Sequence, residues 1–312
     1  MSKLVSVLVP TIGRPQYIKN TITSILNQDY NEIEVLISDN LPAISTKSIL
    51  GDKIDPRIKI IERDRRYGFS EHMNLCINDA SGYYVMILSD DDLICSNYIS
   101  SMIGLFDDNE GVMVGLGLQN IIGEDNTSLD VSEMNDNVFN LFDGTEYSLN
   151  CFRGKLHLPI YTYISLFARK MDMLAAGGFQ AYPDGSNADN YLFYSLALQG
   201  KVGISNCLMG YRVYPSSSGL STAFEKLYLA TWLYDRDVSS LFWNQARTTF
   251  LNKCYLRLWV KLSSTRMLKC RLFSIYKNSF GRFSIAINLL RVIFCFFPRN
   301  IFFGFWNSEN LK

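Results

Sequence analysis

The chain has 312 residues and no net charge, with 30 Lys and Arg against 30 Asp and Glu, and 48% of its residues are hydrophobic. This length and composition suffice for a sizeable core and exclude an intrinsically disordered chain. The charge is unevenly spread, because residues 245–312 carry 12 basic residues and one acid, a net +11, while residues 1–244 carry 18 basic residues and 29 acids, a net −11. A basic, apolar tail on an acidic body predicts an anionic surface as a partner.

The seven cysteines are scattered and form no Cys-x-x-Cys pair. An odd, unpatterned set predicts reduced core thiols in a cytosolic protein, and neither a disulfide framework nor a zinc site. The N-terminus lacks the length and the cleavage site of a signal peptide, so its short apolar run predicts a buried strand.

Strand and helix patterns alternate along the first part of the chain. Short apolar runs predict strands over residues 5–9, 34–38, 58–61, 83–88 and 112–122. Apolar residues at helical spacing predict helices over residues 18–26, 70–81 and 97–106. This alternation is typical of βαβ units, so we expect an α/β fold with a mostly parallel sheet flanked by helices.

The remainder of the chain is less regular. Residues 123–160 show no assignable pattern, residues 175–178 are typical of a helix end, and residues 187–198 predict a helix. After about residue 221 the pattern changes to long helical stretches. We therefore expect one domain over residues 1–220 and a basic, aromatic-rich helical extension over residues 221–312.

Asp90, Asp91 and Asp92 directly follow the apolar strand at 83–88. Ligands of open α/β sheets bind beyond the carboxyl ends of the strands. Adjacent carboxylates raise one another's pKa unless a cation lies among them, and Mn²⁺ or Mg²⁺ prefers such oxygen ligands. The alternative is a helix N-cap followed by a solvated turn. The pair Asp107-Asp108 has no strand before it and predicts a solvated turn.

Asp39 ends the predicted strand at 34–38 and therefore lies at the same edge of the sheet. Its carboxylate could accept a hydrogen bond from the ring N–H or the ribose hydroxyl of a nucleoside. It could equally be a turn residue that bonds its own backbone, and that interpretation is favoured for Asp39 taken alone.

Five segments in this order, with this spacing, resemble glycosyltransferase family 2. They include Val-Pro-Thr-Ile-Gly-Arg-Pro, Tyr-Gly-Phe-Ser-Glu-His-Met-Asn and the strand that leads into Asp-Asp-Asp, and they cover residues 9–15, 25–30, 34–40, 67–74 and 80–92. Residues 176–179, 188–191 and 200–202 resemble the acceptor-side segment of the family more loosely. The resemblance implies a GT-A fold over residues 1–220, with a nucleotide-sugar half over about 1–110 and an acceptor half over about 111–220.

The resemblance also implies roles for individual residues. Pro10, Thr11 and Arg14 match the loop that holds the nucleotide, and Asp39 matches the acid that contacts the base or ribose. Asp90 and Asp92 match the two ends of the Asp-x-Asp motif, which binds Mn²⁺ or Mg²⁺ mainly through its second acid. Asp91 lies between them on the donor side.

Asp189 matches the general base of the family, with Asp184 as its rival. Two departures stand out, because a common Glu-Asp pair is Ala188-Asp189 here and a common Arg-Asn pair is Met73-Asn74. His72 could contact the donor or be a partly buried structural histidine. Arg212 could close over the donor phosphates or be an ordinary surface residue.

The implied reaction is an inverting transfer of a sugar from a nucleotide-sugar donor to a hydroxyl of a glycan acceptor. The likeness to bacterial O-antigen and polysaccharide enzymes implies a lipid-linked acceptor. One rival is a nucleotidyltransferase acting on sugar phosphates, although residues 11–15 are not a Gly-rich phosphate loop. The other is a non-catalytic carbohydrate-binding GT-A domain, which the intact Asp90, Asp92 and Asp189 disfavour.

The tail contains the aromatic runs 292–297 and 301–306, interrupted by Arg291, Pro298 and Arg299. A spanning helix needs about 20 continuous apolar residues. Basic, aromatic-rich helices instead lie in the membrane interface. We therefore expect a peripheral protein on the cytoplasmic face of the cell membrane, with no nucleic-acid partner. The alternative is that these runs pack on the catalytic domain.

Overall fold

The computed structural model describes residues 3–41, 44–51, 54–122, 139–152, 162–185, 187–212, 237–238 and 240–241. The chain divides into two compact units, Met1–Thr249 and Phe250–Lys312, and every described residue belongs to the first unit. The domain boundary expected near residue 220 and almost all of the expected extension over residues 221–312 lie outside the described residues.

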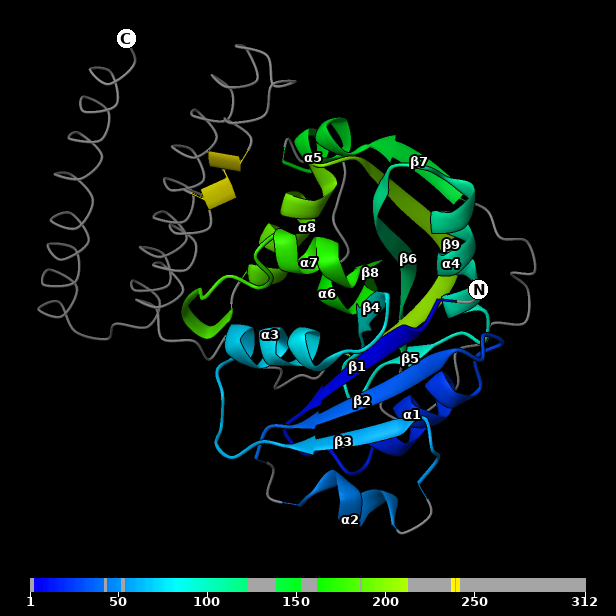
Figure 1. Cartoon of the computed structure of the whole chain (residues 1–312), viewed down its shortest axis with the longest axis vertical. Coiled ribbons are helices and arrows are strands. Elements are labelled where there is room, and N and C mark those ends of the chain that lie inside the picture. Colours follow the sequence, from blue (N-terminus) through cyan, green and yellow to red (C-terminus); the bar gives the residue numbers. More distant parts are fainter. Residues whose placement is uncertain are drawn as a thin grey trace, which may run out of the picture. The chain divides into compact units, whose positions relative to one another are not determined.

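One half of the sheet is parallel and is built from the N-terminal strands (Figure 1). β1 (Val5–Thr11) pairs in parallel with β2 (Ile33–Asp39) on one side and with β4 (Tyr84–Ile87) on the other, and β3 (Ile58–Glu62) pairs in parallel with β2. These four strands confirm the strands expected over 5–9, 34–38, 58–61 and 83–88. Their apolar runs are continuous because β1, β2 and β4 are buried on both faces.

The other half of the sheet is mixed, and the full strand order is β3-β2-β1-β4-β8-β6-β9-β5, with β7 also paired to β9. β8 (Leu166–Arg169) is antiparallel to β4 and to β6 (Val112–Ile122). β9 (Lys201–Arg212) is parallel to β6 and antiparallel to β5 (Leu93–Ile94) and β7 (Phe139–Asp143). The expected α/β class is confirmed, and β6 confirms the strand expected over 112–122.

The helices alternate with the strands as expected in the first half of the chain. The predictions for 18–26, 70–81, 97–106 and 187–198 are confirmed by α1 (Ile18–Leu26), α3 (Phe69–Asp79), α4 (Tyr98–Asp108) and α8 (Ala188–Ala197). The other described helical elements are α2 (Thr46–Leu50), α5 (Gly144–Phe152), α6 (Thr162–Ser165), α7 (Lys170–Ala175) and the 3₁₀ turn η1 (Pro183–Gly185).

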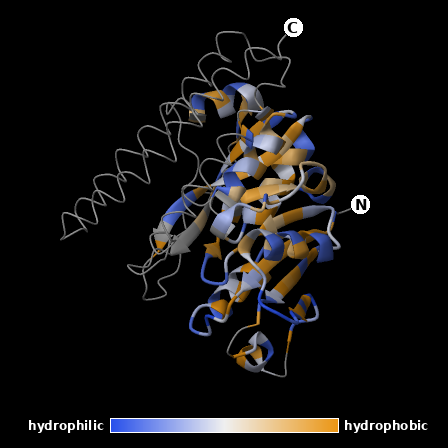
Figure 2. Cartoon of the chain, turned by 90° about the vertical axis from the view of Figure 1, so that its left-hand side faces the viewer, coloured by the Kyte–Doolittle hydropathy of each residue, from blue (hydrophilic) through white to orange (hydrophobic). Residues whose placement is uncertain are grey.

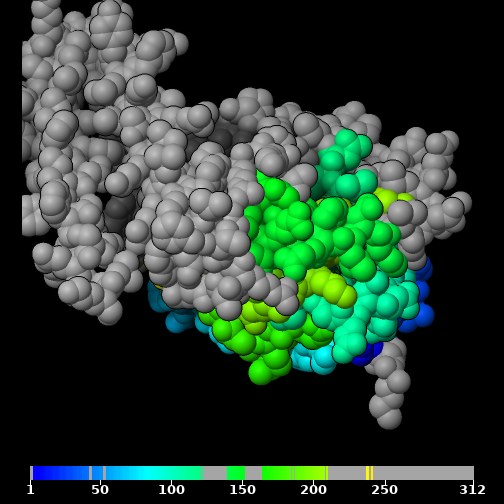
Figure 3. Space-filling view, turned by 90° about the horizontal axis from the view of Figure 1, so that it is seen from above, coloured from blue at the N-terminus to red at the C-terminus, as the bar shows by residue number. Residues whose placement is uncertain are grey.

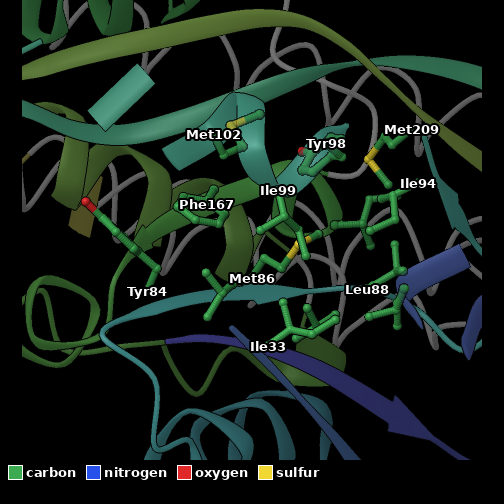
Figure 4. Packing of buried hydrophobic residues seen from close by; sticks show 14 of the residues in the cluster. Ile33, Tyr84, Met86, Leu88, Ile94, Tyr98, Ile99, Met102, Phe167 and Met209 are labelled. Carbon is green, nitrogen blue, oxygen red and sulfur yellow. The ribbon is translucent and has the colours of Figure 1, made fainter. Parts of the chain in front are cut away.

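The main core lies on the face of the sheet that α1 and α4 cover. Side chains alternate between the two faces of a strand, so Val5, Val7 and Val9 of β1 point to the same face. They pack in one cluster with β2 and β4 and with residues of α1 and α4, among them Ile22 and Ile99. Figure 4 shows its central part, with Tyr84, Met86, Met102 and Phe167 among the labelled side chains. Figure 2 shows hydrophobic and hydrophilic residues alternating along the described helices and strands.

α3 covers the opposite face of the parallel half. It contacts β1, and it also contacts α7 and η1 from the second half of the chain. In Figure 1 it lies between strands β1–β3 and the green loop that follows α7. The space-filling view likewise shows green residues from the second half beside blue-green residues from the middle of the chain (Figure 3). The two halves of the described domain therefore meet in a continuous structure.

The segment Asn-Gln-Asp-Tyr at 27–30 ties the end of α1 to the start of α4. Gln28 Nε2 donates to the carbonyl of Cys95 at 2.6 Å, and the backbone N–H of Ile99 donates to Gln28 Oε1 at 3.0 Å. The helix's own N-cap residue, Asn97, makes no side-chain capping bond. Gln28 therefore acts as the N-cap of α4 from a different element, satisfying a donor that would otherwise be left open in the first turn.

We expect Gln28→Leu to lower the free energy of unfolding by about 1–3 kcal/mol, because it keeps the volume but leaves the buried Ile99 N–H without its acceptor. Urea unfolding of the purified protein measures this difference. The matched control is Gln199→Leu, since Gln199 is exposed and only donates to the carbonyl of Ser195. The control should change stability by less than about 0.5 kcal/mol, and an equal loss in both variants would contradict the capping role.

Candidate functional site

The carboxyl ends of β1, β2 and β4 meet at one edge of the sheet. Thr11 pairs with Asp39 at the ends of β1 and β2. Leu8 pairs with Ile87, and the Leu88 N–H donates to the Leu8 carbonyl at 2.9 Å. Asp90 follows two residues later, in a turn that the Asp92 N–H closes by donating to the Ser89 carbonyl at 3.2 Å. The polar residues expected at this edge are therefore neighbours because the strands that carry them are parallel.

Asp90 is held on both of its carboxylate oxygens by the loop after β1. The Thr11 hydroxyl donates to Oδ2, and the Gly13 N–H donates to that hydroxyl at 2.9 Å. Arg14 reaches Asp90 Oδ1 at 3.1 Å and Asp91 Oδ2 at 2.5 Å through the same guanidinium nitrogen. The structure thus brings Thr11, Arg14, Asp90 and Asp91 together, as the sequence analysis expected.

The group of acids at this edge, Asp90–Asp92, is buried. The three residues are 3–5% exposed, and burial raises the pKa of Asp90 to about 6, against the opposing effects of Arg14 and Thr11. Asp91 raises the pKa of Asp90 further. Three carboxylates with one guanidinium carry a formal charge of −2 when all are ionised. A divalent cation would balance that charge.

The side chains at this edge fit a hydrated divalent metal that shares its coordination with a substrate. Among the described residues, no group of three or more His, Cys, Asp or Glu side chains is placed to hold a metal ion alone. Mg²⁺ commonly takes only one or two protein carboxylates and completes its shell with water and substrate phosphate. Asp90 also binds Thr11 and Arg14, so the assignment of Asp90 and Asp92 as the two metal ligands stays a prediction.

Asp39 is buried and uses both carboxylate oxygens within the protein. Oδ2 accepts from the backbone N–H of Thr46 at 2.8 Å, and Oδ1 accepts from the Thr46 hydroxyl at 2.5 Å. Asp39 therefore fixes the first turn of α2 to the end of β2. A carboxylate has about four acceptor positions, so its expected contact with a base or ribose stays a prediction. Pro10 is buried in β1 and pairs with Ser38.

His72 is not brought to the cluster of acids. It is buried on α3, and its Nε2 lies 2.8 Å from the hydroxyl of Ser38. That hydroxyl also accepts from Arg63 Nε at 2.8 Å. Because side chains alternate along β2, Ser38 and His72 lie on the opposite face of the sheet from Asp39. Of the two roles considered from the sequence, this position favours the structural one.

The remaining expected residues lie in the second half of the chain. Asp189 is half-buried in the first turn of α8, where the helix dipole favours a carboxylate. Asp184 lies in η1 and Arg212 ends β9, but the structure describes neither side chain. The β5–β9 pairing sets Leu93 opposite Gly210. Because these two strands are antiparallel, the end of β9 that carries Arg212, two residues after Gly210, lies on the same side of this pair as Asp92, which precedes Leu93.

Sequence reasoning missed two polar residues on α3 that bind the loop after α7. The Ser70 hydroxyl donates to the carbonyl of Gln180 at 2.6 Å. The Asn74 amide accepts from the Phe179 N–H at 2.8 Å and donates to the Phe179 carbonyl at 2.9 Å. Asn74 belongs to the segment 67–74 that carries the family resemblance, but its partner lies 105 residues away. The sequence could therefore single out Asn74 as part of a motif, but it gave no indication of the residue that Asn74 binds.

Comparison with known proteins agrees with this geometry. Residues 6–172 match the family model described as Glycosyl transferase family 2. A GalNAc(5)-diNAcBac-PP-undecaprenol beta-1,3-glucosyltransferase from Campylobacter jejuni is 36% identical over 105 residues, 33% of this chain and 34% of that protein. The UDP-Glc:alpha-D-GlcNAc-diphosphoundecaprenol beta-1,3-glucosyltransferase WfgD of Escherichia coli is 28% identical over 102 residues, 33% of this chain and 40% of that protein. The matched regions thus span well under half the length of these relatives.

Two solved structures share the fold at low sequence identity. S. aureus TarS 1-349 in complex with UDP-GlcNAc has a TM-score of 0.60 and 15% identity, and the match covers 82% of this chain and 70% of that chain. The mannosyltransferase PcManGT from Pyrobaculum calidifontis, in complex with GDP-Man and Mn2+, has a TM-score of 0.53 and 13% identity, covering 96% and 82%. These likenesses confirm the fold class. Among the residues that the structure describes, no helix is long and apolar enough to cross a membrane.

The Ser38–His72 contact leads to a prediction about acid stability. Burial, helped by the charge of Arg63, lowers the pKa of His72 from 6.5 to about 4. The unfolded chain takes up the proton near pH 6.5, so the stability that His72 contributes is complete above that pH and is lost as pH falls toward 4. We expect the free energy of unfolding to fall by about 2 kcal/mol between pH 7 and pH 5 through this residue.

Urea unfolding of the wild type and of His72→Gln at both pH values measures this effect. The variant should be less stable at pH 7 and should show a smaller fall toward pH 5. Asp90 acts in the opposite direction, because its raised pKa favours the folded protein as pH falls below about 6. Asp90 is present in both proteins, so the difference between the two pH dependences isolates His72. Equal dependences would contradict a buried neutral histidine.

Proposed function

Because the chain belongs to glycosyl transferase family 2, we propose that it transfers a sugar from a nucleotide-sugar donor to a hydroxyl of a glycan acceptor. The observation that carries the proposal is the buried group Asp90–Asp92, held by Thr11 and Arg14 at the carboxyl edge of the parallel strands. This edge is where open α/β sheets bind ligands. A cluster of buried carboxylates suits a metal-bound diphosphate better than a free anion.

On the donor side, the loop after β1 and the ends of β2 and β4 form the nucleotide site. Thr11 and Arg14 orient Asp90, and Asp39 offers its remaining acceptor positions to the base or ribose. Asp92, with Asp90, would hold Mn²⁺ or Mg²⁺, and this ion when bound offsets the charge that develops on the leaving diphosphate. The presence of GDP-Man and Mn2+ in a fold relative supports this assignment.

On the acceptor side, Asp189 is the general base and takes the proton of the attacking hydroxyl. A single displacement at the anomeric carbon inverts its configuration, and it needs no protein nucleophile. The names of both glucosyltransferase relatives specify undecaprenol-linked acceptors. They support a lipid-linked glycan acceptor here, in the synthesis of a bacterial surface polysaccharide such as an O-antigen.

The decisive experiment replaces one acid of the cluster. We expect Asp92→Asn to abolish sugar transfer and to weaken Mn²⁺-dependent nucleotide binding without unfolding the protein. A thermal-shift panel of UDP-, GDP- and dTDP-sugars, with Mn²⁺ or with EDTA, first identifies the donor, because a ligand that binds only the native state raises the melting temperature. Transfer and binding are then measured with that donor.

The matched control is Asp108→Asn, which removes the same charge from an exposed acid at the end of α4. It should transfer sugar at the wild-type rate. The metal role of Asp92 is wrong if the Asp92 variant also keeps full activity, with Mn²⁺ and with EDTA alike.

The setting of the proposed reaction is the cytoplasmic face of the cell membrane. Its basis is the charge of +11 over residues 245–312 and the aromatic runs within them. Except for residues 237–238 and 240–241, the extension over 221–312 lies outside the described residues, so this part of the proposal rests on the sequence. Each Lys or Arg near an anionic surface contributes roughly 1 kcal/mol.

We expect the full-length protein to sediment with vesicles in proportion to their anionic lipid content. Binding should fall as salt rises, because charges are screened over about 10 Å at 0.1 M ionic strength, yet it should not vanish while aromatic side chains remain inserted. Co-sedimentation across a salt series, with neutral vesicles as the control, measures both effects. A protein that ignores anionic vesicles at low salt would rule out the interfacial role.

A further inference from the structure

Side chains of α3 form hydrogen bonds with the main chain of the loop that connects α7 to α8. The helix contacts α7, which precedes this loop, and η1, which lies within it, and Figure 1 shows the loop beside one end of α3. The described residues of the loop, 176–185 and 187, precede Asp189 in the first turn of α8. The path of this loop therefore decides where that carboxylate lies.

Asn74 holds one point of the loop with two hydrogen bonds. Its side-chain amide pairs with both backbone groups of Phe179, at 2.8 Å and 2.9 Å, in the way a neighbouring strand would. The preceding residue, Gly178, has a left-handed φ of +60°, and a Cβ there would collide with Asn74 Oδ1. Glycine is required at 178 both by the backbone conformation and by the close approach of the amide.

Two further contacts hold the loop, one before its 3₁₀ turn and one at the last residue of that turn. Ser70, one helical turn before Asn74, donates to the carbonyl of Gln180 at 2.6 Å. Gly185 has a φ of +71°, and a Cβ there would collide with the ring of Phe69. Phe69 also meets Phe179 edge to face, with 5.9 Å between ring centroids. The loop is thus fixed to α3 at 178–180 and again at 185, four residues before Asp189.

The N-terminal end of α3 is fixed in the same manner to the donor edge of the sheet. The Asn40 amide pairs with both backbone groups of Tyr67, accepting from its N–H at 2.8 Å and donating to its carbonyl at 3.0 Å. Asn40 directly follows Asp39, and Gly68, next to Tyr67, is the N-cap of α3. A continuous set of hydrogen bonds therefore runs from the end of β2, through α3, to the loop before α8.

We propose that Asn74 is a positioning residue for sugar transfer, which sets the Asp189 carboxylate relative to the donor edge by fixing the 178–185 loop to α3. This inference rests on the proposed role of Asp189 as the general base. A general base must come within about 2.6–3.2 Å of the proton it takes, and a displacement of about 1 Å at a reacting group can lower the rate by about 10²-fold. Asn74 therefore affects the rate of transfer and not the affinity for the donor.

The test is a double-mutant cycle of Asn74→Ala and Asp189→Asn in the full-length protein. In the wild-type background, Asn74→Ala should lower kcat by about tenfold or more while the Kd of the nucleotide-sugar, measured by titration in the presence of Mn²⁺, stays within about twofold. In the Asp189→Asn background, the same substitution should lower kcat by less than about twofold, because the group that it positions is already gone.

Two further variants provide a matched control and an alternative test of the same loop. Asn109→Ala is the matched control, because Asn109 also donates to a backbone carbonyl, that of Leu105 at 3.0 Å, but it lies at the amino end of β6, at the opposite edge of the sheet. It should leave kcat unchanged. Ser70→Ala removes one bond to the same loop and should lower kcat in the same direction by a smaller factor, which provides the answer if Asn74→Ala does not fold.

The possible outcomes separate this inference from the proposed function. The single variant Asp189→Asn tests the general base by itself. If this variant transfers sugar at the wild-type rate, the assignment of Asp189 as the base is wrong. The cycle is then run with Asp184→Asn, because Asp184 lies within the same fixed loop. An equal loss of kcat from Asn74→Ala in both backgrounds would overturn the positioning role. A large rise in the Kd of the donor, with kcat unchanged, would also overturn it.

Discussion

The parallel pairing of β1 with β2 and with β4 is the constraint on which the candidate site depends. It brings three strand ends to one edge, so that Thr11 pairs with Asp39 and lies within hydrogen-bond reach of Asp90, 79 residues later in the chain. Burying carboxylates is unfavourable unless they are bonded. The loop after β1 supplies those bonds through Thr11 and Arg14. Any change that shifts β4 against β1 would separate the acids from both partners.

The two faces of this parallel half serve different purposes. The face under α1 and α4 is apolar and forms the main core. The face under α3 contains a polar network in which Ser38 bonds His72 and Arg63, and Arg63 also pairs with Asp79 at 2.6 Å. Buried polar groups require definite geometry, because each lost bond costs about 1–3 kcal/mol. α3 is therefore held in one position and orientation on the sheet. This fixed position matters because α3 also binds the loop between α7 and α8.

The sequence predicted the fold best where local patterns were strong. The strands of the parallel half were recognisable because both of their faces are buried, which makes their apolar runs continuous. β8 was not recognised because helices adjoin it directly at both ends, and β9 because three glycine and serine residues interrupt its apolar pattern. Both strands depend on pairing with distant parts of the sheet, which no local pattern records.

The candidate site was predicted to a similar extent and for a similar reason. Asp39 and Asp90–Asp92 were found because strand ends in an α/β sheet are predictable positions. The sequence analysis left the role of His72 open, since which face of the sheet its partner Ser38 occupies depends on the pairing of β2. Two contacts could not be predicted, because they form only when the chain has folded. One is the binding of Asp90 and Asp91 by the single guanidinium of Arg14. The other is the pairing of Asn74 with Phe179.

The amide contacts of Asn40 and Asn74 have a consequence for how such a chain can diverge. Both side chains bond the main-chain N–H and carbonyl of their partners, Tyr67 and Phe179. Every residue except proline presents these two groups, so the partner positions can change identity during evolution without loss of either bond. Because the two asparagines bond only main-chain groups, the hydrogen bonds that join the two halves can be kept while most of the surrounding sequence changes.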